Sequence, residues 1–559
     1  MKRYFHLFCS GLTFFFLMSC SSPENKTASF RFFSYAGEDS MHNTPVDLQN
    51  QYLNPILGGF YPDPSICRKG EDFFLVNSSF SFYPGIPIFT SKDLVNWTQI
   101  GNVLDRPSQL NLENGIRISG GIYAPAIKYN KYNDTFYLIT TCVDGIGNFV
   151  VKTKDPYQGW SDPILLPSVG GIDPSLFFDD DGNAYVVHND APEGEPQWDG
   201  HRAIWIHSYD TETDQTFGTP RVIVDGGTDK SKHPIWIEGP HIYKRNGKYL
   251  LICAEGGTSQ QHSEVAFTSD HIYGPYIPSE YNPILTQRDL PEDRLNKITS
   301  TGHADIVEDI DGKTWAVFLG CRPYEGNHYN TGRETFLLPV EWENDIPIIL
   351  PHEENVPIIV SKENLENKHR MFGGNFSWQD NFDEDSLDAR WLMIRTPKKK
   401  WYNLKENRLE LSLLPVDIND KGQPAFLGVR QQHIVFEITT ELDFTPDSDQ
   451  DVAGLACFQK EGYNIVFGKT LQNGKQILFI DRAENEIKRI ATLEISNAYV
   501  NSPIQLKISG NGKNYNFYAS FSGKKWQPVL ENVDARNLST ESAGGFNGTI
   551  IGLYAGTKK

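Results

Sequence analysis

Short apolar runs separated by turn residues recur along residues 51–350. Each unit opens with a polar or small residue, continues as an apolar run, and returns after a turn in a second apolar or aromatic run. Turns such as Asp181-Gly182 and Asn246-Gly247 between apolar runs are strong hairpin signals. Because five such units follow one another at intervals of roughly 50–65 residues, the pattern predicts the blades of a β-propeller.

The residues that open the five units are candidates for a functional site. They are Asp63, Ala124, Asp173, Glu238 and His303. The innermost strand of every blade faces the propeller axis, so corresponding positions of different blades converge there. A single acid beside Pro or Gly-Pro is more often a turn residue. Three acids at the same repeat phase instead indicate carboxylates that meet at one end of a central channel.

The hydrophobic pattern changes at about residue 370. Beyond it, apolar and polar residues alternate, as in Phe436-Glu437-Ile438-Thr439 and Ile504-Gln505-Leu506-Lys507. Such alternation is typical of strands that bury one face, as in a β-sandwich. The sequence therefore predicts an all-β protein with a propeller over 51–350, a polar linker over 351–369 and a sandwich over 370–559.

The N-terminus carries a targeting signal. Lys2 and Arg3 precede an apolar stretch that is too short to span a bilayer comfortably. The stretch ends in Leu17-Met18-Ser19-Cys20, which resembles a bacterial lipoprotein cleavage box. We therefore expect a signal peptide over 1–19, lipid attachment at Cys20, a tether over 20–50, and a place in the cell envelope. An ordinary secretory signal with an incidental cysteine is the alternative.

Composition narrows the range of partners. The formal net charge of −20 argues against nucleic acid, because phosphate binding needs a basic surface. Membrane contact is expected only through the N-terminal lipid. Aromatic residues make up 13% of the chain, which suits a sugar site because aromatic faces stack on pyranose rings. The cysteines after Cys20 stand among apolar residues, which favours buried thiols over disulfides or a metal cage.

Several segments combine Gly, Pro and acidic residues in distinctive ways. They are residues 54–66 (NPILGGFYPDPSI), 120–125 (GGIYAP), 171–177 (GIDPSLF), 236–240 (WIEGP), Gly302-His303 and 332–335 (GRET). Together these segments resemble glycoside hydrolase family 43. The C-terminal part, around Phe376-Ser377-Trp378 and Arg430-Gln431-Gln432-His433, is similar to the sandwich domain attached to the β-xylosidases and some arabinofuranosidases of that family.

The resemblance implies a five-bladed propeller followed by a jelly-roll, concanavalin-like sandwich. It implies inversion at the sugar carbon, with Asp63 as general base, Glu238 as general acid and Asp173 as auxiliary acid. The chemistry agrees, since the base must stay ionised, the acid must keep its proton, and a third carboxylate helps it do so. No cofactor is required. At the position of His303 the family supports a central calcium ion or a water, so a structural calcium is an expectation, with a buried, ion-free histidine as the alternative.

Candidates for substrate contact are Phe80, Phe82, Tyr123, Arg333 and Phe426. Arg333 is also suited to hold Asp63 or to offset the carboxylate charge. The aromatic candidates have an ordinary core role as their alternative. Phe426 ends the segment 421–426, which we expect the sandwich to lend to the mouth of the site, although an ordinary surface turn is the alternative. Tyr123 stands where some relatives carry Trp, which leaves the subsite preference open.

The sequence thus predicts an exo-acting, inverting glycosidase that releases terminal xylose from xylo-oligosaccharides or xylan. An α-L-arabinofuranosidase acting on arabinoxylan or arabinan side chains is the alternative within the enzyme class, because pocket shape decides between the two sugars. A non-catalytic carbohydrate-binding lipoprotein is the alternative from another class. The three acids argue against it, since a binding protein has no need of them.

Overall fold

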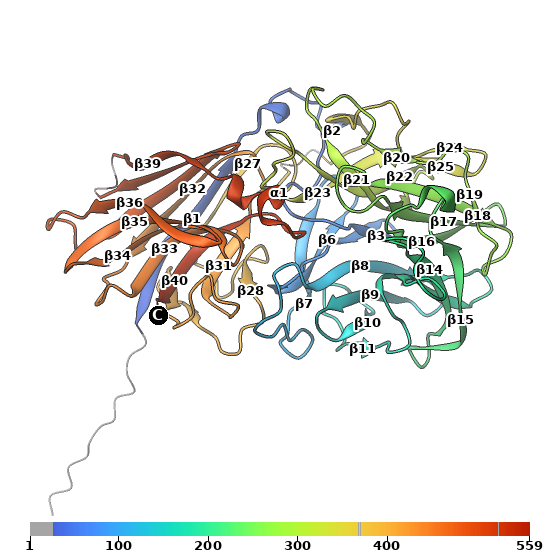
Figure 1. Ribbon diagram of the computed structural model, residues 1–559, viewed down its shortest axis with the longest axis horizontal. Coiled ribbons are helices and arrows are strands. Elements are labelled where there is room, and N and C mark those ends of the chain that lie inside the picture. Colours follow the sequence, from blue (N-terminus) through green and yellow to red (C-terminus); the bar gives the residue numbers. More distant parts are fainter. Residues whose placement is uncertain (1–25, 367, 369, 522, 524, 559) are drawn as a thin grey trace, which may run out of the picture.

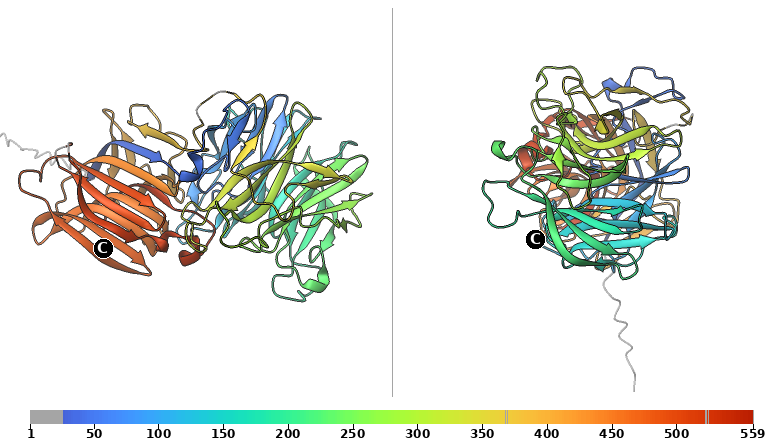
Figure 2. Two further views of the ribbon diagram at one scale, coloured as in Figure 1. Left: turned by 90° about the horizontal axis from the view of Figure 1, so that it is seen from above. Right: turned by 90° about the vertical axis from the view of Figure 1, so that its right-hand side faces the viewer.

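The computed structural model describes residues 26–366, 368, 370–521, 523 and 525–558. It consists almost entirely of β-strands, arranged in two bodies that lie side by side (Figure 1). Apart from the dark-blue first strand, which lies in the sandwich, blue to yellow colours follow a five-bladed propeller and orange to red colours follow a two-sheet sandwich. The left view of Figure 2 shows the two bodies side by side from a second direction. The all-β prediction of a propeller and a sandwich is confirmed.

Each blade is an antiparallel sheet whose strands follow one another along the chain. Blade 1 contains β3 (Ser65–Lys69), β4 (Asp72–Val76), β6 (Gly85–Ser91) and β7 (Thr98–Leu104). Blade 2 contains β8 (Gly121–Asn130), β9 (Thr135–Val143), β10 (Gly147–Thr153) and β11 (Ile164–Leu165). Blade 3 contains β12 (Ile172–Phe178), β13 (Ala184–Asp190), β14 (Ala203–Asp210) and β15 (Gln215–Asp225). Blade 4 contains β16 (Glu238–Arg245), β17 (Lys248–Glu255), β18 (Ser263–Ser269), β19 (Ile277–Pro278) and β20 (Leu285–Thr286). Blade 5 contains β21 (Thr299–Glu308), β22 (Thr314–Cys321) and β23 (Arg333–Pro339).

The first strands of the blades form the axis of the propeller. They contact one another in the ring order β3, β8, β12, β16, β21 and back to β3. Each blade packs between two neighbouring blades, so its strands bury side chains on both faces. This explains continuous apolar runs such as Leu138-Ile139 and Val186-Val187. The ring order makes blade 5 the neighbour of both blade 1 and blade 4.

The sandwich consists of two antiparallel sheets that enclose one apolar core. Among the described residues the first sheet contains β29 (Tyr402–Leu404), β30 (Leu409–Ser412), β1 (Thr27–Gly37), β32 (Val435–Asp443), β37 (Ile504–Asn511), β38 (Asn514–Ser520) and β39 (Gln527–Asp534), with β27 (Phe376–Asp380) paired to β1. The second contains β36 (Glu486–Glu494), β35 (Lys475–Glu484), β34 (Tyr463–Gln472), β33 (Asp451–Lys460), β40 (Ile550–Thr557), β31 (Ala425–Arg430), β28 (Leu392–Ile394) and β5 (Phe82–Tyr83).

Short elements complete the described part of the chain. β2 (Gln51–Leu53) pairs with β26 (Ile359–Ser361), and β24 (Glu341–Glu343) pairs with β25 (Ile346–Ile348). The helical turns are η1 (Ser40–His42), η2 (Lys230–Lys232), η3 (Arg536–Leu538) and α1 (Thr540–Ala543). Among the described residues, none of these helices has the length and apolar character needed to cross a membrane. The cysteines from Cys67 to Cys457 are free and buried, as predicted.

Strand β1 corrects the prediction that residues 20–50 form a tether. It pairs with β27, β30 and β32 in the middle of the first sheet, and Figure 1 shows it in blue among orange and red strands. Phe30, Phe33 and Tyr35 are fully buried. Their alternation is broken by a β-bulge between Phe30 and Phe33, which hides the strand pattern in the sequence. The predicted signal peptide and Cys20 lie outside the described residues.

The predicted domain boundaries need two further corrections. β26 lies inside the predicted linker 351–369 and pairs with β2 at the start of the propeller. β5 leaves blade 1 and extends the second sheet of the sandwich, with Tyr83 opposite Met393. The linker therefore pairs with the propeller, and a strand from blade 1 belongs to a sheet of the sandwich, so the two domains are joined by more than a linker.

A buried ion network fixes the contact between the domains. The Arg322 guanidinium donates to the Glu334 carboxylate at 2.6 Å, to Asp39 at 2.5 Å and to the Gln432 carbonyl at 3.2 Å. Glu334 also accepts the Gly59 amide at 2.8 Å. Since breaking a buried ion pair costs about 3–5 kcal/mol, this network resists relative movement of propeller and sandwich.

Candidate active site

The residues at the blade heads share an unusual backbone. Positive φ values between 31° and 54° occur at Asp63, Ala124, Asp173 and His303. In the fourth blade the residue with this conformation is Gly239 (φ 55°), so Glu238 lies one residue before the repeat position assigned to it from the sequence. A Cβ on Gly239 would lie 2.9 Å from the His303 ring, which explains the glycine. Left-handed backbone at four non-glycine heads is the kind of strain that clusters at functional sites.

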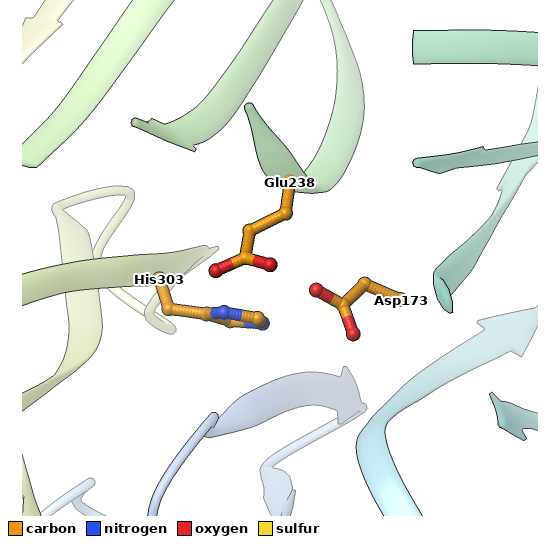
Figure 3. A group of neighbouring side chains, drawn as sticks. All are labelled: Asp173, Glu238 and His303. Atoms are coloured by element: carbon orange, nitrogen blue, oxygen red, sulfur yellow. The ribbon is translucent and has the colours of Figure 1, made fainter. Parts of the chain in front are cut away.

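Three side chains converge where the inner strands meet (Figure 3). One ligand-type atom from each of Asp173, Glu238 and His303 lies within 4.8 Å of the others, and all three residues are buried. Figure 3 shows the two carboxyl groups facing one another, with the imidazole beside them. Blades 3 and 4 are neighbours, which explains why Asp173 reaches Glu238. Two buried carboxyl groups this close do not readily ionise together.

Burial and like charge raise the pKa of both of these carboxyl groups. Burial raises the pKa of Glu238 well above its ordinary value, and the negative charges of Asp173 and Asp63 add to the shift. Burial likewise raises the pKa of Asp173 to about 6, with Asp63 adding to it and His303 opposing it. The Asp173–Glu238 pair therefore retains a proton near neutral pH.

The pKa of Asp63 is shifted in the opposite direction. Its Oδ1 accepts a hydrogen bond from Arg333 Nη1 at 2.9 Å, and its Oδ2 accepts one from the Ser78 hydroxyl at 2.6 Å. His303 Nδ1 lies 4.0 Å from Oδ1. Burial acts to raise the pKa of Asp63, but the Arg333 charge, His303 and the Ser78 hydrogen bond outweigh it and leave the pKa below its ordinary value. Asp63 is therefore ionised at neutral pH.

These groups line a cavity of about 410 Å³ at the end of the propeller axis, a size typical of small-molecule sites. Its polar lining residues are Asp63, Asp173, Glu238, His303, Arg333, Arg117 and Thr258. Its other lining residues are Phe80, Tyr123, Val143, Ile172, Ile235, Trp236, Gly257 and Phe546. The structure thus brings the three predicted acids together with His303, Arg333, Phe80 and Tyr123, from all five blades.

One wall of the cavity comes from the sandwich. Phe546 follows Gly544-Gly545 after α1, and its ring lies 6.3 Å from that of Phe80 and 5.9 Å, edge to face, from that of Tyr123. Its carbonyl accepts a hydrogen bond from Arg333 at 3.4 Å. The sandwich therefore contributes to the mouth of the site, although through Phe546, which sequence reasoning missed. The only local signal is an aromatic residue directly after two glycines in a loop.

Two predicted substrate contacts are corrected. Phe82 is fully buried in β5 and packs against Phe60, at 5.6 Å between ring centroids. Phe426 is fully buried in β31 and packs against Phe458, at 5.8 Å. Both are core residues because β5 and β31 belong to the same sheet of the sandwich. The segment before Phe426 contacts the propeller instead, where the Lys421 carbonyl accepts a backbone amide from the loop between β7 and β8.

A second, much smaller cavity of about 10 Å³ lies further along the axis, next to Asp63, Asp173, His303 and His241. It has room for one water-sized group. Burial lowers the pKa of His241 to about 3, and its Nδ1 has no hydrogen-bond partner among the described residues. Calcium takes six to eight oxygen ligands. This lining fits a single water molecule better than a calcium ion with that shell.

An ionised carboxylate and a proton-holding pair of carboxyl groups line one cavity at the end of a propeller axis. They supply the base and the acid that glycosidic cleavage needs, as the site of a glycoside hydrolase must. The chain belongs to glycosyl hydrolases family 43. The family model matches residues 52–347, and a model for the β-xylosidase C-terminal concanavalin A-like domain matches residues 379–559.

Individual relatives match both domains. A xylosidase/arabinosidase of Butyrivibrio fibrisolvens is 38% identical over 509 residues, which cover 90% of this chain and 95% of the relative. A non-reducing-end α-L-arabinofuranosidase of Bacteroides ovatus is 33% identical and covers 91% of this chain and 92% of its own. Among solved structures, a GH43_12 protein retrieved from a capybara gut metagenome has a TM-score of 0.89 at 45% identity, over 95% of this chain and all of its own.

Proposed function

We propose that the protein is an inverting, exo-acting glycosidase that removes terminal xylose from xylo-oligosaccharides or xylan, with terminal α-L-arabinofuranose as the alternative sugar. The observation that carries the proposal is the opposite protonation of carboxyl groups around one cavity. The pKa of Asp63 is lowered, while that of Glu238 is raised. Direct displacement at a sugar carbon requires one group of each kind.

Asp63 acts as the general base in this proposal. It takes a proton from a water molecule, whose oxygen forms a bond to the anomeric carbon from the face opposite the leaving group. Arg333 and Ser78 hold the Asp63 carboxylate from two sides, which fixes its direction and keeps it ionised. Blade 5 separates blades 1 and 4, so the base and the acid come from non-adjacent blades. That arrangement supports a gap wide enough for a sugar carbon and a water.

Glu238 acts as the general acid. As the bond between the anomeric carbon and the glycosidic oxygen breaks, Glu238 transfers its proton to that oxygen, and the leaving sugar departs with a hydroxyl group. Asp173 keeps the proton on Glu238 before the reaction, because two adjacent buried carboxyl groups do not readily ionise together. The displacement thus consumes one water and leaves its proton on Asp63 while Glu238 is ionised. Proton exchange with solvent then returns Asp63 to the carboxylate and Glu238 to the acid, which completes the turnover.

The walls of the cavity support attack at chain ends. Phe546 of the sandwich closes one side against Phe80 and Tyr123, so that a long chain does not pass freely across the propeller face. The names of the Butyrivibrio and Bacteroides relatives include both xylosidase and arabinosidase activity. They support pentose-containing oligosaccharides as substrates and both sugars as candidates.

We also propose that Cys20 carries a lipid anchor that holds the enzyme in the cell envelope. The support is the Leu17-Met18-Ser19-Cys20 sequence. Residues 21–26 separate Cys20 from the first residue of β1 at Thr27. Six residues extend over at most about 20 Å. An anchored enzyme would therefore have its sandwich close to the membrane surface.

The proposal is tested by assaying nitrophenyl β-D-xyloside and nitrophenyl α-L-arabinofuranoside side by side, followed by product analysis on xylo-oligosaccharides. Single pentoses released from one end, and α-xylose as the first product of a β-xyloside by NMR, support the proposal. Initial β-xylose would show a covalent intermediate and contradict inversion, while mid-length fragments at early times would contradict exo action.

A further inference from the structure

A tryptophan stands at the lip of the catalytic cavity, directly beside the proposed acid. Trp236 precedes Glu238 by two residues and lines the cavity, yet it is 36% exposed. Its neighbour Ile235 also lines the cavity and is 54% exposed. Large apolar side chains left open to water at the mouth of a site indicate a surface that a ligand covers.

The backbone of Trp236 has a conformation that bulky aromatic residues rarely adopt. Its φ of +59° is left-handed, which is an outlier for a bulky aromatic residue. Its amide donates to the Gly200 carbonyl at 2.8 Å, and the Ile235 carbonyl accepts the Gly256 amide at 2.8 Å. The segment is therefore fixed from two sides, by the loop between β13 and β14 and by the end of β17.

Arg202 supports the indole ring. Its guanidinium carbon lies 4.8 Å from the ring centroid of Trp236, at cation–π distance. Its Nε and Nη2 donate to the Asn189 side-chain oxygen at 3.1 and 2.9 Å, and Asn189 in turn donates to the Ile237 carbonyl. Arg202 thus covers one part of the ring, while Trp236 keeps an exposed surface.

The reaction at Glu238 indicates which sugar of the substrate contacts the exposed indole ring of Trp236. The glycosidic oxygen that receives the Glu238 proton joins the terminal sugar to the next one. A rigid side chain beside Glu238 at the outer lip therefore faces that next sugar, while Asp63 and Arg333 come from blades 1 and 5 across the cavity. We propose that Trp236, backed by Arg202 and flanked by Ile235, is the binding platform for the leaving-group sugar, which stacks as a pyranose ring on the indole.

This inference rests on the proposed function and adds a preference to it. Oligosaccharides with a pyranose next to the terminal unit are the favoured substrates, and glycosides with a small leaving group do not use the platform. Stacking on one aromatic ring changes affinity on the order of 10-fold. The side chain of Trp236 also acts to lower the pKa of Glu238, against the larger effects of burial and Asp173.

The test compares kcat/KM on xylotriose with kcat/KM on methyl β-D-xyloside, which share the terminal sugar and differ in the leaving group. In Trp236→Ala, the loss on xylotriose should exceed the loss on methyl xyloside on the order of 10-fold. Arg202→Ala should lower the same ratio less. Phe217→Ala, which changes an aromatic residue 59% exposed on β15, is the matched control and should leave the ratio unchanged.

Trp236→Phe separates the platform from the effect of Trp236 on the pKa of Glu238. Phenylalanine retains a stacking face, so the substrate ratio should stay near that of the wild type. It lacks the polar N–H of the indole, so the pKa of Glu238 should rise and the basic limb of the pH profile should move to higher pH. This variant also keeps the test valid if Trp236→Ala fails to fold.

The outcomes distinguish the inference from the function on which it rests. Equal losses on xylotriose and methyl xyloside in Trp236→Ala would refute the platform while leaving the glycosidase in place. A wild-type enzyme that cleaves neither xyloside but cleaves arabinofuranosides would shift the test to methyl arabinofuranoside and arabinosyl-xylotriose, with the same expected ratio. A wild-type enzyme inactive on all four would instead contradict the proposed function.

Discussion

Arg333 allows the electrostatic argument for the active site to be tested as a shift of the whole pH profile. Its side chain is 8% exposed, and it is the cation paired with Asp63. The Arg333 charge acts to lower the pKa of Asp63 and also that of Glu238. Replacing it with methionine removes the charge and retains much of the side-chain volume.

The size of the effect follows from the geometry. Two opposite unit charges about 4 Å apart interact by about 4 kcal/mol at an effective dielectric constant of about 20, and 1.36 kcal/mol corresponds to one pKa unit. Ser78 and His303 still act on Asp63 in the variant, and water that enters replaces part of the loss. We therefore expect the acid limb of Arg333→Met to move up by about 1–3 pH units.

The roles of Asp63 and Glu238 determine the direction in which each limb of the pH profile moves. Activity needs Asp63 ionised, so a higher pKa of Asp63 moves the acid limb to higher pH. Activity needs Glu238 protonated, so a higher pKa of Glu238 moves the basic limb to higher pH as well. The measurement is kcat/KM on a nitrophenyl glycoside from acid to alkaline pH, so that both limbs are covered. Arg333→Lys keeps a charge and should keep both limbs near the wild type. Limbs that stay in place in Arg333→Met, or move in opposite directions, would falsify the assignment.

Three further outcomes are expected. Asp63→Asn should keep the circular dichroism spectrum and thermal midpoint of the wild type but lower kcat on the order of 10²–10⁴-fold, and near wild-type turnover would rule out its role as base. Phe33→Ala should destabilise the sandwich by about 3–5 kcal/mol in denaturant unfolding, because a fully buried ring 4.9 Å from that of Trp391 is lost; an unchanged midpoint would contradict the placement of β1 in the core. Cys20→Ser should abolish lipidation and release the protein from membranes after detergent-free lysis, whereas unchanged pelleting would place the anchor elsewhere.

The convergence of the catalytic carboxyl groups can be predicted from the sequence because the propeller is built from repeats. Asp63 and Asp173 occupy the same phase of different blades, and a ring of blades brings equal phases to one axis. Glu238 was found by the same route, although its blade places Gly239 at that phase. A repeat pattern that is read over whole blades does not resolve a shift of one residue within a blade.

The remaining parts of the site depend on contacts between distant segments. Phe546 reaches the cavity only because the sandwich contacts the propeller, and no periodicity around residue 546 encodes that contact. The sequence predicts Phe82 as an aromatic candidate and Phe426 as the end of a Gly- and Pro-containing segment, yet β5 and β31 bury both residues in one sheet. Trp236 was visible within a motif, but its exposure depends on a left-handed backbone that the sequence does not reveal.

The position of β1 has a consequence for how the chain is made. Tyr35 of β1 contacts His433, which lies 398 residues later in the sequence. Strand β1 is therefore synthesised long before the strands with which it pairs. The propeller, enclosed between these two parts, has all its strands available earlier. We expect the nascent chain to complete the propeller first and to close the sandwich around β1 last, a slow long-range pairing. Removal of everything after residue 370 would therefore leave a propeller that carries an unpaired, apolar strand at its beginning, and a stable catalytic fragment would have to omit both parts of the sandwich.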